Sequence, residues 1–280
     1  MVQSKHNIND YKLKIAYPTI VLTLLAFTVY IIASIATYQG YLGIGWGISI
    51  NALVAYLLFT SMHEAGHLNI SGNHNSLRWI DEIIGWLSGI PLFAPFYVFK
   101  VIHFRHHAYT NDPEKDPDHW LASKNLFSLL FHSTTIFPVY LIKGGRLLFS
   151  KERIPRKVRR ELKIGFIGLF LLLTLLTTLR ITLGWAMVLQ LWIVPAFIAQ
   201  VLLAFAFDWL PHHPHEEKAR FLNTRVFDIP GLRHLLLGQN YHLIHHLHPR
   251  IPFYDYKKVY LKIKEELKRK GVDIISLGHS

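Results

Sequence analysis

Long runs without a charged residue constrain this chain more than any other feature. No charge occurs in residues 17–38 or in residues 41–62. A helix needs about 20 consecutive apolar residues to cross the roughly 30 Å of hydrocarbon in a bilayer, and each run is long enough. Residues 163–183 and 185–207 form a second apolar pair. The sequence therefore predicts an integral membrane protein with a bundle of four transmembrane helices.

Two shorter apolar stretches lie between the two pairs. Residues 83–99 and 126–142 are interrupted by Pro91, Pro95 and Pro138. Proline cannot continue the hydrogen-bond ladder of a helix, so we expect both stretches to lie at the membrane interface or to enter it halfway. Hydrophobic residues make up 51% of the chain, which is high for a soluble protein, and no linker or repeat divides it. The prediction is one all-α domain covering residues 1–280.

The lysines and arginines predict on which side of the membrane the loops lie. The turn inside the first pair of spans has none, and the turn inside the second pair has only Arg180 beside it. Cytoplasmic loops carry the excess of lysine and arginine, so we expect the other loops and both termini in the cytoplasm. The net charge of +12 is concentrated in residues 143–163 and 257–271. We interpret these two runs as contacts with anionic lipid headgroups, and we expect no binding to nucleic acid.

Eight of the 18 histidines fall into three clusters, HEAGH, HFRHH and HLIHH. Residues three or four apart share one face of a helix, so each cluster can direct its imidazoles to a common point. Each cluster follows an apolar stretch, which brings all three to the cytoplasmic ends of the predicted spans. The clustered residues are His63, His67, His103, His106, His107, His242, His245 and His246.

The number of clustered histidines predicts two metal ions rather than one. Catalytic zinc takes three protein ligands and a water, so eight imidazoles exceed what one such ion uses. Imidazole suits iron, copper, nickel and zinc alike, and ligand type leaves the choice of metal open. The chain has no cysteine, which excludes a disulfide framework and an iron–sulfur cluster of its own. Electrons, where a reaction needs them, must come from another protein.

Two other classes of protein compete with this interpretation. HEAGH also satisfies H-E-x-x-H, the motif of zinc proteases in which the glutamate acts as base. An intramembrane protease of that kind needs a third ligand, but residues 163–207 contain no acid before Asp208, and six clustered histidines would have no role. A metal transporter would spread its ligands along a path through the membrane, whereas these gather at one end.

The three clusters resemble the histidine boxes of the membrane fatty-acid desaturase and hydroxylase superfamily. Two longer stretches, HFRHHAYTNDPEKDPDHW and the segment from Phe207 (FDWLPHHPH) to Tyr254 (HLIHHLHPRIPFY), are similar to segments of the carotene ring hydroxylases of cyanobacteria. The resemblance implies that four membrane helices and a cytosolic helical cap hold two non-haem irons. The chain departs from the carotenoid enzymes at Glu64 and His248, where aspartate and tryptophan are common.

The resemblance also implies the ligands of the irons. It assigns the eight clustered histidines to the metals and adds a ninth ligand from the segment after the fourth span. We choose His212 and expect His213 and His215 at the surface or interface. Asp208 and Asn240 are expected to orient a ligand or to hold a metal-bound water. One of Asp112, Asp116 and Asp118 is expected to accept the free ring N–H of a ligand histidine.

The activity implied by the resemblance is an O2-dependent oxidation that takes electrons from an external donor such as ferredoxin. We predict hydroxylation of the β-ionone ring of a carotenoid at C3, from β-carotene through cryptoxanthin to zeaxanthin, with the substrate entering from the bilayer. A carotene C4 ketolase and an acyl-lipid or fatty-acid desaturase are the alternatives, because the same histidines serve all three. Docking of an acidic electron carrier is the alternative role for the basic runs.

Overall fold

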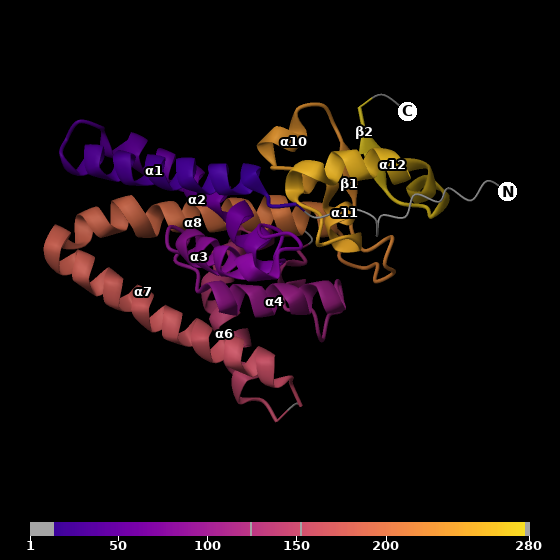
Figure 1. Ribbon diagram of the computed structural model, residues 1–280, viewed down its shortest axis with the longest axis horizontal. Coiled ribbons are helices and arrows are strands. Elements are labelled where there is room, and N and C mark those ends of the chain that lie inside the picture. The colour runs from indigo at the N-terminus through magenta and orange to yellow at the C-terminus, as the bar shows by residue number, and fades with distance from the viewer. Residues whose placement is uncertain (1–13, 124, 152, 278–280) are drawn as a thin grey trace.

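The computed structural model describes residues 14–123, 125–151 and 153–277, and these residues are mostly helical (Figure 1). The predicted all-α class is confirmed except for two short strands, β1 (Val226–Asp228) and β2 (Ile274–Ser276), which pair in parallel. The basic segment before Tyr17 lies almost entirely outside the described residues.

The first two spans form a helical hairpin. Helices α1 (Tyr17–Tyr38) and α2 (Ile44–Gly66) are joined at Gly40, whose φ of 81° a residue with a side chain adopts only at a cost. Each is long and apolar enough to cross a membrane. The buried Tyr30 hydroxyl donates to the carbonyl of Leu191 over 2.8 Å and ties the hairpin to a later helix.

The second pair of spans lies in one long helical run, Arg156–His212. Gly184 interrupts it with φ 80° and ψ 161°, and the chain doubles back there (Figure 1). The break falls between the predicted spans 163–183 and 185–207. When the whole run is counted as one helix, it is the third helix among the described residues that is long and apolar enough to cross a membrane. Its parts are α7 (Arg156–Val188), the π-helical turn η4 (Leu189–Ile193), α8 (Val194–Leu203), a second π-helical turn η5 (Ala204–Trp209) and α9 (Leu210–His212).

The shorter apolar stretches form two pairs of helices. Pro91 and Pro95 separate the first pair, because proline lacks the N–H that a helix interior needs. The second pair bends by 62° and together is apolar enough for a broken span or a re-entrant loop, which would raise the count of spans to four. The four helices are α3 (Arg78–Gly89), α4 (Phe96–Tyr109), α5 (Leu126–Ser133) and α6 (Ile136–Phe149).

Residues 213–277, here called the C-terminal segment, have a core of their own at one end of the long helices (Figure 1). Val259, Ile263 and Leu267 recur at helical spacing and pack with Leu243 and Ile244. The first core lies between α2, α3, α4 and α8. Besides β1 and β2, the C-terminal segment contains α10 (Leu232–Leu235), η6 (Gln239–Tyr241), α11 (His242–Leu247), η7 (Phe253–Asp255) and α12 (Tyr256–Arg269), while the 3₁₀ turns η2 (Asn75–Leu77) and η3 (His119–Leu121) lie earlier.

Glycine allows α7 to approach α4 closely, as small residues do between membrane helices. A Cβ at Gly165 would lie 2.8 Å from the backbone nitrogen of Val98. Gly165→Ala is therefore expected to lower the free energy of unfolding by about 1–3 kcal/mol through overpacking, measured by thermal unfolding in detergent. Gly45→Ala in α2 is the control, since its Cβ would meet nothing within 4 Å. Equal stabilities of the two variants would contradict this packing.

Candidate metal centre

The structure gathers nine histidines from four helices into two groups. Within each group, every residue offers a ring nitrogen that lies within 4.8 Å of the others. The ninth member is His212, the residue chosen from the segment after the fourth span. The five-histidine group contains His63, His67, His103, His107 and His245, and the four-histidine group contains His106, His212, His242 and His246.

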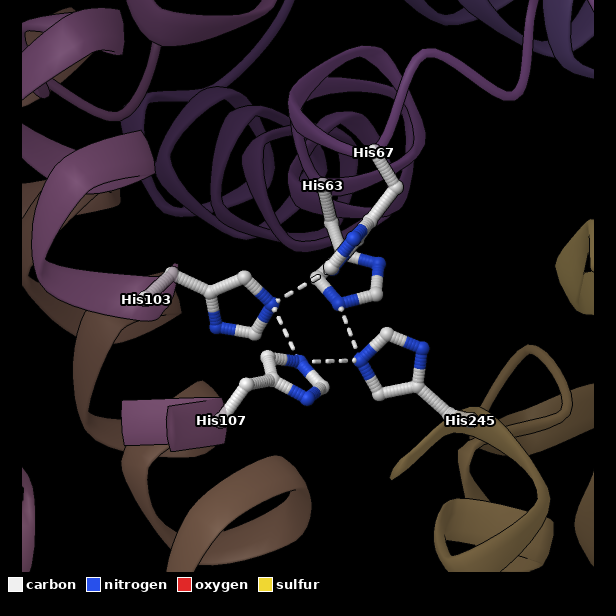
Figure 2. Close-up of side chains that lie close together, drawn as sticks. All are labelled: His63, His67, His103, His107 and His245. Carbon is white, nitrogen blue, oxygen red and sulfur yellow. Dashed lines mark hydrogen bonds between the residues drawn. The ribbon is translucent and has the colours of Figure 1, made fainter. Parts of the chain in front are cut away.

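In the five-histidine group the Nε2 atoms face a common centre (Figure 2). Neighbouring Nε2 atoms are 2.9 Å apart for His67 and His103, 3.1 Å for His103 and His107, 2.8 Å for His107 and His245, and 3.0 Å for His63 and His245. Two nitrogens about 2.1 Å from one metal are about 3.0 Å apart at a right angle and about 3.4 Å apart at a tetrahedral angle. The distances between neighbouring Nε2 atoms therefore match the right-angle spacing of ligands around a five- or six-coordinate ion.

The four-histidine group lies directly beside the first. His242 Nε2 is 3.1 Å from the Nε2 atoms of both His212 and His246. The His107 and His246 rings, one from each group, have centroids 4.3 Å apart. Two ions held by these groups would therefore be neighbours.

Hydrogen bonds among the imidazoles do not explain this arrangement. A ring nitrogen has either one in-plane lone pair or one proton, so it cannot point at two neighbours at once, as His103 and His242 would have to. Burial holds the pKa of His103, His107, His242, His245 and His246 well below its usual range, which leaves these rings neutral. Neutral nitrogens that converge on a point provide lone pairs for a cation.

The second ring nitrogens hold several of these imidazoles in place. With Nε2 unprotonated, Nδ1 carries the proton and donates it, which fixes the ring orientation and raises its basicity. These partners follow no spacing rule in the sequence, apart from Gln239, three residues before His242. The contacts are His245 to Tyr256 Oη (3.0 Å), His242 to Gln239 Oε1 (2.8 Å), His212 to the carbonyl of Asn223 (3.2 Å) and His246 to Thr110 Oγ1 (3.4 Å).

The acidic loop after α4 provides the partner of His106. Asp116 Oδ1 is 3.0 Å from His106 Nδ1, and its Oδ2 accepts the backbone N–H of Asn111 over 2.7 Å. Burial alone would lower the pKa of His106, but the charge and hydrogen bond of Asp116, together with the charges of Asp118 and Asp208, outweigh burial and raise the pKa to about 10. Asp118 lies 3.6 Å from the same nitrogen, whereas Asp112 pairs with Lys218 instead. Of the three aspartates named from the sequence, Asp116 is the one positioned against a ligand.

Among the described residues, neither Asp208 nor Asn240 forms a hydrogen bond to a histidine of the two groups. The two ring nitrogens of His212 face the carbonyl of Asn223 and Nε2 of His242 rather than Asp208. Asp208 lies four residues before His212, but the π-helical turn η5 interrupts the α-helical spacing that would place the two side chains on one face. The Asn240 amide donates to the carbonyl of Phe227 over 2.8 Å. His215 was expected at the surface or interface, and this is wrong: it is buried, with Nε2 3.9 Å from Asp208. His213 is half-buried.

Glu64 is not placed as the base of a zinc protease would be. It is fully buried, and its carboxylate oxygens accept from the Asn69 amide and from the backbone N–H of Phe253, each over 3.3 Å. Both histidines of HEAGH also share their centre with three more imidazoles, which leaves no three-ligand zinc site. The protease interpretation therefore has no support in the geometry.

An apolar cavity opens beside both groups. His63, His103, His106 and His242 line one end of it. From Pro95 to His106 it follows α4 for 11 residues, or about 17 Å of helix rise. Phe59, Phe99, Leu203, Phe207 and, from the bent pair, Phe137 and Tyr140 form its walls. The shape suits a long apolar molecule with one part held against the histidines.

Comparisons with known proteins agree with this site. The family model described as fatty acid desaturase matches residues 39–278. A Delta(9) fatty acid conjugase-like enzyme of Dimorphotheca sinuata is 27% identical and covers 69% of this chain. The chain spans 60% of that enzyme's length.

Bacterial relatives give a similar result. Dihydrorhizobitoxine desaturase of Bradyrhizobium elkanii is 28% identical over 70% of this chain and 61% of its own. An sn-1 acyl-lipid omega-3 desaturase (ferredoxin) of Nostoc sp. (strain 36) is 24% identical over 75% and 64%. None of these three is described as a carotene hydroxylase. The match of the family model over residues 39–278 shows that the chain belongs to the fatty acid desaturase family, a family of membrane oxidoreductases.

Proposed function

We propose that this protein is an O2-dependent di-iron enzyme that introduces a double bond into the acyl chain of a membrane lipid. The observation that carries the proposal is the set of nine converging imidazoles at one end of an elongated apolar cavity. The acyl substrate is suggested by the similarity to a fatty acid conjugase-like enzyme and to an acyl-lipid desaturase, and a ferredoxin-like donor by the Nostoc relative, an acyl-lipid omega-3 desaturase (ferredoxin).

The residues present fit two irons. The five-histidine group would hold one and the four-histidine group the other, and five nitrogens at right-angle spacing exceed what tetrahedral zinc accommodates. When bound, the irons would supply the chemistry that removes two hydrogens from neighbouring carbons while O2, two external electrons and two protons give two molecules of water.

The other residues position the substrate and the ligands. The rings of Phe59, Phe99 and Phe207 give the metal end of the cavity a largely apolar lining. Asp208 lines the same end, and its unpaired Oδ1 can accept a hydrogen bond from a water there. Asn240 acts from further away, because it anchors the turn before His242 to β1.

The proposal includes the arrangement in the membrane. The four predicted spans would cross the bilayer as a bundle, and the C-terminal segment would be the cytosolic cap, with both termini on the cytoplasmic side. This orientation is supported by the excess of lysine and arginine outside the two hairpin turns. The whole of residues 1–280 would then form one domain.

Hydroxylation of a carotenoid ring at C3 is the second candidate, and ketolation at C4 is its variant. The resemblance of HFRHHAYTNDPEKDPDHW and of the Phe207–Tyr254 stretch to carotene hydroxylases favours it. The aromatic walls of the cavity are also compatible with a ring.

Expression in bacteria that contain β-carotene and a ferredoxin system tests both candidates. Gas chromatography of fatty acid methyl esters should show a new double bond, and chromatography of pigments should show no oxidised carotenoid. His107→Ala and His246→Ala should each abolish the product, while His74→Ala, at an exposed position outside both groups, should retain it. The appearance of zeaxanthin or cryptoxanthin would contradict acyl desaturation and support hydroxylation of the carotenoid ring. Echinenone or canthaxanthin would instead indicate ketolation.

The Asp116→Asn variant tests whether the Asp116 carboxylate orients the His106 ring for metal binding. Loss of the carboxylate should weaken metal binding at the four-histidine group by about 10–100-fold, measured as iron retained per chain against a chelator. The purified protein should hold about two irons and Asp116→Asn about one. Asp112→Asn is the matched control in the same loop, because Asp112 pairs with Lys218. Equal iron retention in the two variants would remove Asp116 from this role.

Ala204→Leu tests the cavity. Ala204 is buried in η5 and lines the cavity close to Asp208, so a larger side chain there should obstruct the substrate. Turnover should fall at least about tenfold while the iron content stays at about two per chain, since the side chain of Ala204 has no metal-binding atom. Unchanged turnover would mean that the substrate does not enter by this cavity.

A further inference from the structure

We propose that the exposed basic face of α12, formed by Lys258, Lys262 and Arg269, is the docking surface for an acidic one-electron carrier protein. The inference rests on the proposed function, because that reaction needs electrons from outside. The chain has no cysteine and so no iron–sulfur cluster to store them.

The charge of α12 fits an acidic partner. The helix contains six lysines and arginines and two glutamates. Lys264 and Lys268 are paired within the protein, with Asp228 and Glu265. Among the described residues, no ion pair or hydrogen bond engages Lys258 or Lys262, and both are exposed. Spacings of four and seven residues place Lys258, Lys262 and Arg269 on one helical face. Glu266, four residues after Lys262, and Asp255, three residues before Lys258, lie beside them and leave this face with a smaller net positive charge.

A membrane surface is a poorer partner for this helix. A helix that lies on a bilayer inserts its apolar face among the lipids. The apolar face of α12, with Val259, Ile263 and Leu267, is instead buried in the core of the C-terminal segment. The basic run at 143–163 differs, because it leads into α7, the start of a candidate span, where lipid headgroups are expected.

The same helix is connected to the metal centre. Tyr256, its first residue, is fully buried, and its hydroxyl lies 3.0 Å from Nδ1 of His245 in the five-histidine group. Lys258 follows two residues later, about 3 Å along the helix axis. A carrier bound to the basic face would therefore sit against the helix that contacts a ligand, which gives electrons a short path through Tyr256 and His245.

Zero-length carbodiimide crosslinking tests the surface without turnover. Reduced plant-type ferredoxin, an acidic [2Fe–2S] protein, should form a crosslink to the full-length protein that maps to Lys258 or Lys262 by mass spectrometry. Lys258→Glu/Lys262→Glu should lose the crosslink. Arg156→Glu/Lys157→Glu, at the exposed start of α7, changes the net charge equally and should keep it. A crosslink that maps to residues 151–163 would overturn the proposal.

Kinetics with ferredoxin give a second readout. The α12 variant should raise the KM for ferredoxin about tenfold at low salt with kcat kept, and the difference should vanish at about 1 M salt, where the Debye length is about 3 Å. Turnover with dithionite and a small mediator should match that of the unmodified protein. An unchanged KM, or a defect found only in nanodiscs of anionic lipid, would refute the docking surface. A crosslink at Lys258 with no oxidised product from any substrate would refute the proposed function instead.

Discussion

The fold depends on the convergence of nine imidazoles that cannot satisfy one another. Converging neutral nitrogens inside a protein leave lone pairs without donors, and unpaired buried polar groups are costly. A bound cation would remove that cost, and metal binding would then be coupled to the folding of this region. The surrounding aromatic residues fit this view: the His103 ring stacks on Phe99 at 5.3 Å, and His63 stacks on Phe59 at 6.0 Å. The same phenylalanines line the cavity, so the packing that orients the ligands also shapes the substrate space.

The centre is assembled across two cores. Helices α2 and α4 belong to the first core, whereas α11, with His242, His245 and His246, belongs to the C-terminal segment. Polar contacts join the two: the Asn69 amide donates to the carbonyl of Pro249, and Arg250 donates to the carbonyl of Gly72. Neither core alone carries a complete ligand set, so the C-terminal segment must dock on the helix ends before either group is complete.

Local patterns in the sequence were sufficient for the helices and for the convergence of the three histidine clusters, but not for the contacts around them. The uncharged run 17–38 coincides with α1, and the predicted boundary between the last two spans falls at Gly184. Periodicity reports which face of a helix is buried, and the three histidine clusters are a signal of that kind. Periodicity does not reveal a π-helical turn such as η5, which takes Asp208 out of α-helical alignment with His212. It also does not reveal a partner such as Tyr256, which contacts His245 only after α12 has packed. The parallel pair β1–β2 was missed because each strand has three residues and its partner is about 50 residues away.

In the proposed reaction, the histidine groups would provide the oxidising centre, and the cavity would select the bond that is oxidised. The reacting carbon would be the one held next to the histidines, and its identity would depend on how far the substrate enters along α4 and α8. The bent pair α5–α6 contributes Phe137 and Tyr140 to the walls of the cavity, and η5 contributes Ala204 and Phe207. On the proposed function, the cavity residues of α4, α6 and α8 would therefore be the ones that distinguish an acyl chain from a carotenoid ring.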